Sequence, residues 1–161
     1  MSGQYDSRAD SLAHIHDVRD KIGVFIAEML RRGRDHDASK FSDVEKPRLD
    51  EVLPLLDGVA YGSPAWEDVV NRAAPALEHH FRHNTHHPEH YGNEGVAGMD
   101  LFDVVEMLCD WMAAARRNPA DGVKVAYNVQ KFGIEPQLAS IIANTLERWP
   151  EPDGNGPKRS R

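Results

Sequence analysis

Apolar residues recur at intervals of three and four positions along most of this 161-residue chain. The clearest series lies between residues 10 and 32, where the spacing forms one apolar face of an α-helix that Gly33 can end. Its members are Ile15, Val18, Ile22, Phe25, Ile26, Met29 and Leu30. No segment alternates with the period of two that indicates a β-strand, and no internal repeat or glycine-rich dinucleotide-binding pattern is present. The chain is therefore predicted to be all-α.

Further helices follow in the same pattern. We expect them at about residues 35–56, 64–80, 100–117, 120–132 and 135–149. Pro47 interrupts the helix expected at 35–56. Ser63 and Pro64 fit the N-cap and the first helical position of the helix expected at 64–80. A loop, HPEHYGNEGVAG, precedes the helix expected at 100–117 and separates it from the helix expected at 64–80. The predicted architecture is a compact, single-domain bundle of about six helices.

The composition fits one globular domain. With 40% hydrophobic residues the chain can bury a core, and we assign residues 1–149 to this domain and 150–161, which end in KRSR, to a disordered tail. The net charge of -7, with no broad basic cluster, argues against duplex nucleic acid as a ligand. No leader and no apolar run of about 20 residues is seen. Together with a single cysteine, Cys109, this predicts a cytoplasmic protein without a membrane span.

Six of the nine histidines fall within HHFRHNTHHPEHY, residues 79–91. Helical spacing places His80 on the core-facing side of its helix. His14 lies beside the apolar stripe of the first helix, and the adjacent His36 and Asp37 stand at the start of the second. Three carboxylates share one face of the helix predicted at 100–117: Asp103, Glu106 and Asp110.

Four predicted helices thus offer imidazole and carboxylate groups to one interior. Burying such groups without partners is unfavourable, and a divalent cation would satisfy both kinds at once. Mixed nitrogen and oxygen ligands suit manganese, iron, cobalt, nickel or zinc better than magnesium or calcium. Because no cysteine ligand is offered, we expect a catalytic site with an open coordination position rather than a structural zinc site.

Each of these groups also has an ordinary explanation. Three of the histidines fit the role of ordinary surface residues or of core residues whose hydrogen bonds are satisfied: His16, His79 and His83. The histidine-rich segment could bind metals adventitiously, or could lie at a helix C-terminus where the helix dipole favours it. Asp103 and Glu106 could belong to a solvated acidic face. The His-Asp doublet on one helix and Asp110 on another favour the metal site.

Several motifs resemble those of known metalloproteins. His14, the doublet in HDASK, the later histidines and Asp110 in EMLCDW are similar to the H…HD…H…D pattern of the HD-domain superfamily of metal-dependent phosphohydrolases, which is all-α. Over about residues 12–147, a wider set of motifs resembles a small bacterial and phage family with HDxSK and NxHHPEHY elements. The set is HDASKFSDVE, YGSPAW, ALEHHFRHNTHHPEHY, EMLCDWMAA and NVQKFGI.

The resemblance implies a set of metal ligands. One cation would be held by His14, His36, Asp37 and Asp110, and a second position would be completed by His80 with His86 or His87. The interval between His80 and His86 is shorter than in relatives that bind two metals. The resemblance is therefore compatible with a site for one ion or for two.

The implied reaction is metal-assisted hydrolysis of a small phosphate ester, with a nucleotide as the first candidate. Lys40 stands where mononuclear relatives have a glutamate, so Glu45 or Glu106 would act as acid or base unless metal-activated water attacks unaided. Lys40 is also placed to bind phosphate. Further substrate contacts are implied at Arg116, Asn128 and Lys131.

Two other classes of protein are compatible with the motifs: an HD-type oxygenase with two irons, and a non-catalytic, metal-stabilised helical protein such as a phage accessory factor.

Overall fold

The computed structural model of the chain describes residues 5–116 and 122–150. Over these residues the chain is all-α, as predicted, and no β-strand is present. Backbone contacts divide it into two units, Met1–His36 and Asp37–Arg161. No helix in the described part of the chain is long and apolar enough to cross a bilayer. The predicted tail beyond residue 150 and the predicted helix start at residue 120 lie outside the described residues.

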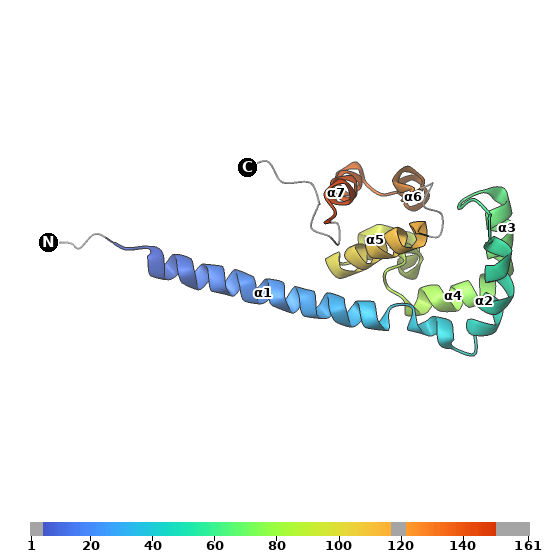
Figure 1. The fold of residues 1–161 in the computed structure, drawn as a ribbon, viewed down its shortest axis with the longest axis horizontal. Coiled ribbons are helices and arrows are strands. Elements are labelled where there is room, and N and C mark those ends of the chain that lie inside the picture. The colour runs from blue at the N-terminus through green and yellow to red at the C-terminus, as the bar shows by residue number, and fades with distance from the viewer. Residues whose placement is uncertain (1–4, 117–121, 151–161) are drawn as a thin grey trace. The chain divides into compact units, whose positions relative to one another are not determined.

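The first unit contains one long helix, α1 (Arg8–Asp35; Figure 1). The predicted end at Gly33 is wrong, since the helix continues to Asp35 and its C-cap is His36, whose ψ is 128°. Pairs of opposite charge on neighbouring turns stabilise it, such as Lys21 and Asp17 at 2.7 Å. None of its residues is buried, and the exposed apolar ones include Leu12, Ile15, Val18, Ile22, Ile26 and Leu30.

The second unit contains the remaining helices, several of them short. In chain order they are η1 (Ala38–Phe41), α2 (Lys46–Val52), η2 (Leu53–Leu56), α3 (Pro64–Arg72), α4 (Ala74–His83), η3 (Pro88–Gly98), α5 (Leu101–Ala115), α6 (Val125–Phe132) and α7 (Pro136–Glu147). The η elements are 3₁₀ helices.

Two of the predicted helices are divided. The one at 35–56 becomes η1, α2 and η2, because Asp37 takes a left-handed backbone conformation and Pro47 lies in the first turn of α2. The one at 64–80 begins as predicted, with the Ser63 side chain accepting a hydrogen bond from the backbone N–H of Trp66 at 3.2 Å. It breaks before α4, because Pro75 has no N–H to donate to the preceding turn.

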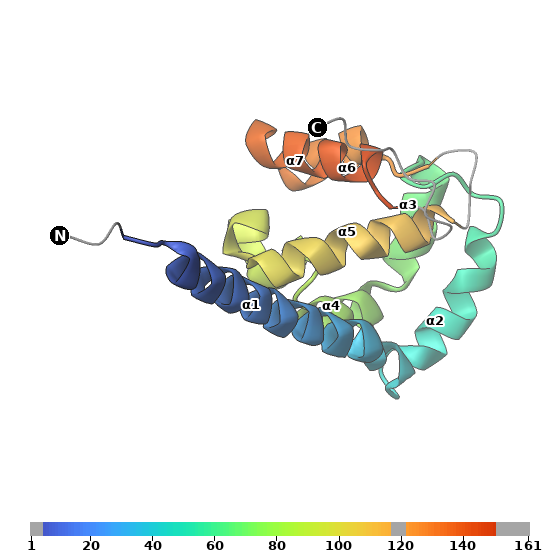
Figure 2. The same ribbon diagram turned by 60° about the vertical axis from the view of Figure 1, so that its left-hand side comes forward.

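The apolar core of the second unit lies among α5, α6 and α7. Its buried centre consists of Leu108, Ile134 and Ile142, surrounded by partly buried residues that include Trp111, Val129, Phe132 and Leu146. Both views show α5 running between α4 and the pair of α6 and α7 (Figures 1 and 2). The same helix also buries two carboxylates, Asp103 and Glu106. Helix α5 therefore packs one face against the apolar core and buries its two carboxylates outside that core.

Candidate metal centre

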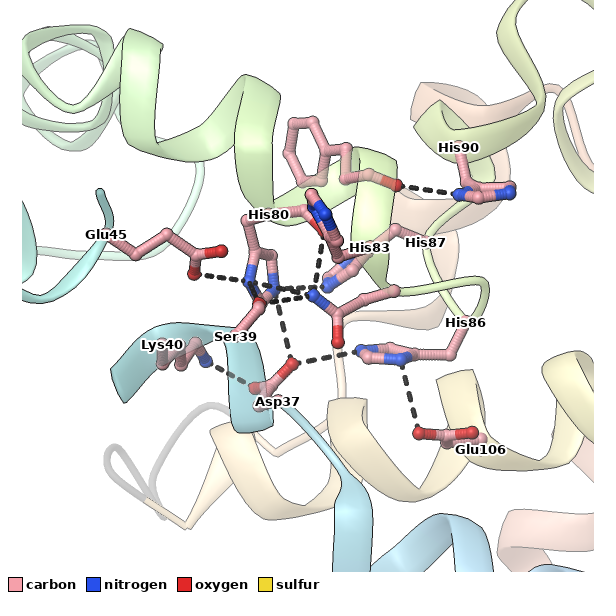
Figure 3. A network of polar contacts seen from close by, with 12 residues as sticks. Asp37, Ser39, Lys40, Glu45, His80, His83, His86, His87, His90 and Glu106 are labelled. Carbon is pink, nitrogen blue, oxygen red and sulfur yellow. Dashed lines mark hydrogen bonds and ion pairs between the residues drawn. The ribbon is translucent and has the colours of Figure 1, made fainter. Parts of the chain in front are cut away.

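The site begins where the chain turns at Asp37. This is the only residue other than glycine with a positive φ in the described part of the chain, at 55°. Aspartate tolerates this conformation better than most side chains do, and functional sites often contain such residues. Lys40, three residues further on, donates to Oδ2 of Asp37 (Figure 3). Oδ1 lies 3.2 Å from Nε2 of His80 and 3.4 Å from Nε2 of His86, so the carboxylate joins the lysine to two imidazoles.

His80 is buried on α4, and a carboxylate lies behind its ring. Its Nδ1 is 2.9 Å from Oε2 of Glu45, of which only 1% is exposed. Burial raises the pKa of Glu45, but hydrogen bonds from His79 and two other side chains outweigh that effect and hold the pKa below its ordinary value. An ionised carboxylate can only accept, so Nδ1 of His80 carries the proton and Nε2 presents its lone pair toward Asp37.

His86 repeats this arrangement from the segment after α4. Its Nδ1 lies 3.2 Å from Oε1 of Glu106 on α5, and its side chain is 2% exposed. With the proton directed at Glu106, Nε2 of His86 presents its lone pair toward Asp37 (Figure 3). Carboxylates behind metal-binding imidazoles fix the tautomer and the ring orientation in this way.

His87 completes the group from the next position in the chain. Its Nε2 lies 2.9 Å from Nε2 of His80. Burial, reinforced by the neighbouring imidazoles of His86 and His80, lowers the pKa of His87 to about 3, although the charges of Asp110 and Asp37 act in the opposite direction. His87 is therefore neutral near pH 7 and able to act as a ligand.

Four donor atoms converge in this place. One atom from each of Asp37, His80, His86 and His87 lies within 4.8 Å of the others. Three imidazole nitrogens and one carboxylate oxygen, without a thiolate, form a donor set that suits first-row divalent cations. The residues present therefore fit the predicted metal.

The other histidines of the segment lie further from the cluster. Nδ1 of His79 is 2.7 Å from Oε1 of Glu45, so His79 contacts the far side of the carboxylate that supports His80. His83 is exposed and stacks on His79, with ring centroids 4.1 Å apart. His90 is also exposed, and its Nδ1 contacts the carbonyl oxygen of Phe81.

The remaining three predicted ligands are not members of this group of four. His14 is exposed on α1 and, like His36, belongs to the first unit of the chain. Asp110 is half-buried on α5, lines the cavity beside His80 and His87, and has a carboxylate oxygen within 4.8 Å of one of Asp37. Metal ligation by these three residues stays a prediction.

Asp103 is buried in a structural position at the start of α5. Its side chain accepts hydrogen bonds from Thr85 Oγ1 and from the Tyr91 hydroxyl, both at 2.6 Å. It also forms a reciprocal capping box with Asp100 at the start of α5. Burial and the Asp103 hydrogen bond raise the pKa of Tyr91 to about 12, so the phenol keeps its proton. A solvated position for Asp103, one of the alternatives above, is wrong, since only 2% of it is exposed.

A cavity of about 550 Å³ opens beside the cluster, a volume usual for small-molecule sites. Of the predicted substrate residues, three line it: Lys40, Asn128 and Lys131. Arg116 does not, because it is exposed at the end of α5 and borders a separate hollow with Met112 and Leu146.

Sequence reasoning missed most of the cavity wall. Aromatic side chains form much of it: Tyr61, Trp66, Phe81, Trp111 and Phe132. Burial, with smaller contributions from Tyr127, Glu89 and Asp110, raises the pKa of Tyr61 to about 12. The motifs YGSPAW and HHPEHY contain Tyr61, Trp66 and Glu89, but nothing in their spacing indicates that they share a cavity with the histidines.

The fold and the site define an all-α chain with a buried cluster of histidines and carboxylates beside a cavity. The chain belongs to the DUF5662 family, described as a family of unknown function, which matches residues 3–148. No similar chain was found among curated proteins or solved structures. The resemblance to the HD-domain superfamily stays a prediction.

Proposed function

We propose that this protein is a metal-dependent phosphohydrolase that acts on a small phosphate ester, with a nucleotide as the first candidate. The observation that supports this most directly is the convergence of Asp37, His80, His86 and His87 beside a cavity that His80, His87 and Lys40 line. A divalent ion held there would lower the pKa of water and stabilise negative charge on phosphoryl oxygens.

In this proposal Asp37 and the three imidazoles are the ligands, and two glutamates position them. Glu45 holds His80 and Glu106 holds His86, each through Nδ1. This placement favours a positioning role for Glu106 over the acid–base role expected from the sequence. Because Glu45 has the same positioning role, proton transfer would rely on metal-activated water.

Lysines would bind the phosphate. Lys40 pairs with Asp37 and lines the cavity, so its ammonium can contact an anion next to the cluster. Lys124 and Lys131 line the same cavity and add positive charge to a chain that is acidic overall. The predicted contacts from Asn128 and Lys131 are compatible with this arrangement, whereas Arg116 lies away from it.

The direct test is a panel of nucleoside mono-, di- and triphosphates, cyclic dinucleotides and an aryl phosphate, each assayed with manganese, cobalt, nickel and zinc. Turnover should require metal and should be abolished in Asp37→Ala but retained in His83→Ala, whose side chain is exposed. If fully metallated wild-type protein leaves every member intact, hydrolysis of these phosphates is wrong, and an iron oxygenase or a non-catalytic metal-binding protein becomes the better interpretation.

A further inference from the structure

The cavity has an aromatic end as well as a metal-binding end. The Tyr61 and Trp66 rings lie with centroids 4.7 Å apart, and Tyr127 packs edge-on against Tyr61 at 5.4 Å. The Tyr61 hydroxyl donates to Oδ1 of Asn128 at 3.5 Å, and Asn128 itself is 3% exposed. These contacts hold a rigid, largely apolar wall, which suits a flat ring.

Glu89 adds a carboxylate to this largely apolar wall. It follows His87 by two positions, on η3, and lines the cavity. Its Oε1 lies 3.5 Å from Nζ of Lys131, which balances its charge. Its Oε2 is buried and has no hydrogen-bond partner in the described part of the chain. A buried carboxylate oxygen without a donor is unfavourable, so this position is suited to a ligand that brings N–H or O–H groups.

The two features restrict the ligand. A carboxylate accepts two parallel hydrogen bonds well, and charged acceptors strengthen each of them. Among nucleobases, guanine presents two adjacent N–H donors on one edge, N1–H and the 2-amino group. Adenine has a ring acceptor beside its amino group, which the carboxylate would repel.

We propose that the cavity end formed by Tyr61, Trp66 and Glu89 binds a planar heterocycle with two adjacent N–H donors, as in guanine, and that Glu89 determines this specificity. This inference rests on the proposed function, because it assigns the phosphate of the same substrate to the metal-binding end. The substrate class is then a guanine nucleotide.

Nucleosides test the ring site without hydrolysis, because they have no phosphate. Binding of guanosine, inosine, adenosine and 1-methylguanosine to the metal-loaded full chain can be measured by calorimetry and by the fluorescence of Trp66 and Trp111, which line the cavity. Guanosine should bind about 10-fold or more tightly than inosine, which lacks only the 2-amino group, the difference expected for one hydrogen bond to a charged group. Adenosine and 1-methylguanosine should bind more weakly still.

The variant Glu89→Gln should remove the preference for guanosine over inosine, and the matched control is Glu94→Gln, which changes an exposed carboxylate on the same η3 element. Equal binding of guanosine and adenosine to wild-type protein would overturn the inference even if Glu89→Gln failed to fold, as would a preference that survives in that variant. Hydrolysis of an aryl phosphate without discrimination among nucleosides would support the proposed function and contradict this inference. Selective guanosine binding with no phosphatase activity would support the ring site and contradict hydrolysis.

Discussion

Helix α1 exposes apolar side chains, whereas the segment from α4 to η3 buries polar ones. On α1, apolar residues are exposed, including Ile22 at 54% and Leu30 at 70%, and no residue of the helix is buried. In the other segment, His80 and His86 are 4% and 2% exposed although imidazoles are polar. Hydrophobic spacing predicted both helices and placed His80 on the core-facing side of α4, but it did not indicate that the apolar residues of α1 are exposed.

This difference in burial indicates which of the two regions contains the functional site. Exposed apolar side chains cost little individually, whereas buried ionisable groups are costly unless something compensates for them. In the second unit the compensation is visible, since each buried imidazole contacts a carboxylate and the remaining nitrogens converge on Asp37. Burial of charge, rather than the number of histidines in the sequence, distinguishes the candidate site.

The largest effect is expected from removing the carboxylate at the centre of the cluster. Asp37→Ala should reduce the affinity for manganese, nickel or zinc by more than the roughly 10- to 100-fold that follows loss of a supporting residue. Metal content after purification without a tag or chelator, and metal titration by calorimetry, measure this. His83→Ala should behave as wild type, and a loss in that variant as large as in Asp37→Ala would show that the exposed histidines belong to the site.

Truncation of a buried and of an exposed isoleucine should separate the two regions by stability. Ile142 is 2% exposed in the core, so Ile142→Ala should lower the free energy of unfolding by roughly 2–5 kcal/mol. Ile22→Ala on α1 should change it by less than about 0.5 kcal/mol. Urea denaturation followed by circular dichroism measures both. Equal losses would mean that the exposed face of α1 is covered in solution.

The supporting glutamates should have an intermediate effect. Glu45→Gln and Glu106→Gln retain the size of the side chain but weaken the hold on Nδ1 of His80 and His86, so metal affinity should fall about 10- to 100-fold. Glu78→Gln on α4 is the matched control, because that carboxylate is 75% exposed and pairs with Arg82. Unchanged affinity in both buried variants would contradict a positioning role.

The smallest effect is expected from pH, which should change the stability of the metal-free protein only slightly per pH unit. The pKa of His87 is lowered to about 3 in the folded chain, whereas it is about 6.5 in an unfolded one. Between these values the unfolded state binds the additional proton, so the stability of metal-free protein should rise with pH, by at most about 1.4 kcal/mol per unit for one proton. Denaturation curves at pH 5, 6 and 7 should show a shallower dependence for His87→Gln, and an identical slope would exclude this origin.

The sequence predicted the all-α class and the approximate positions of most helices, and it named residues that the structure brings together in the candidate site. Local rules suffice for features such as the Ser63 cap, because the capping residue and the helix that it caps are adjacent in the chain. The candidate ligands Asp37, His80, His86 and His87 were all named from motifs. The break between α3 and α4 was missed because a continuous apolar series concealed the effect of Pro75.

Other features depend on contacts between distant segments and could not be obtained from spacing. Glu45 supports His80 across 35 positions, and the Tyr61 hydroxyl reaches Asn128 across 67. The sequence offers Glu45 only as a candidate acid or base, and it gives Tyr61 no role. The contact with His80 and the shared cavity indicate instead that Glu45 supports a candidate ligand and that Tyr61 forms part of the cavity wall.

The central claim is that the converging atoms of Asp37, His80, His86 and His87 bind a first-row divalent cation. Anomalous diffraction from crystals of the full chain grown with manganese or zinc, recorded on both sides of the metal absorption edge, tests this most directly. An anomalous peak between Asp37 Oδ1 and the Nε2 atoms of the histidines, at distances of about 2.0–2.2 Å, is the expected result. A fully ordered cluster with no peak, or a peak only at the half-buried His79 or at the exposed His83 or His90, would contradict the claim.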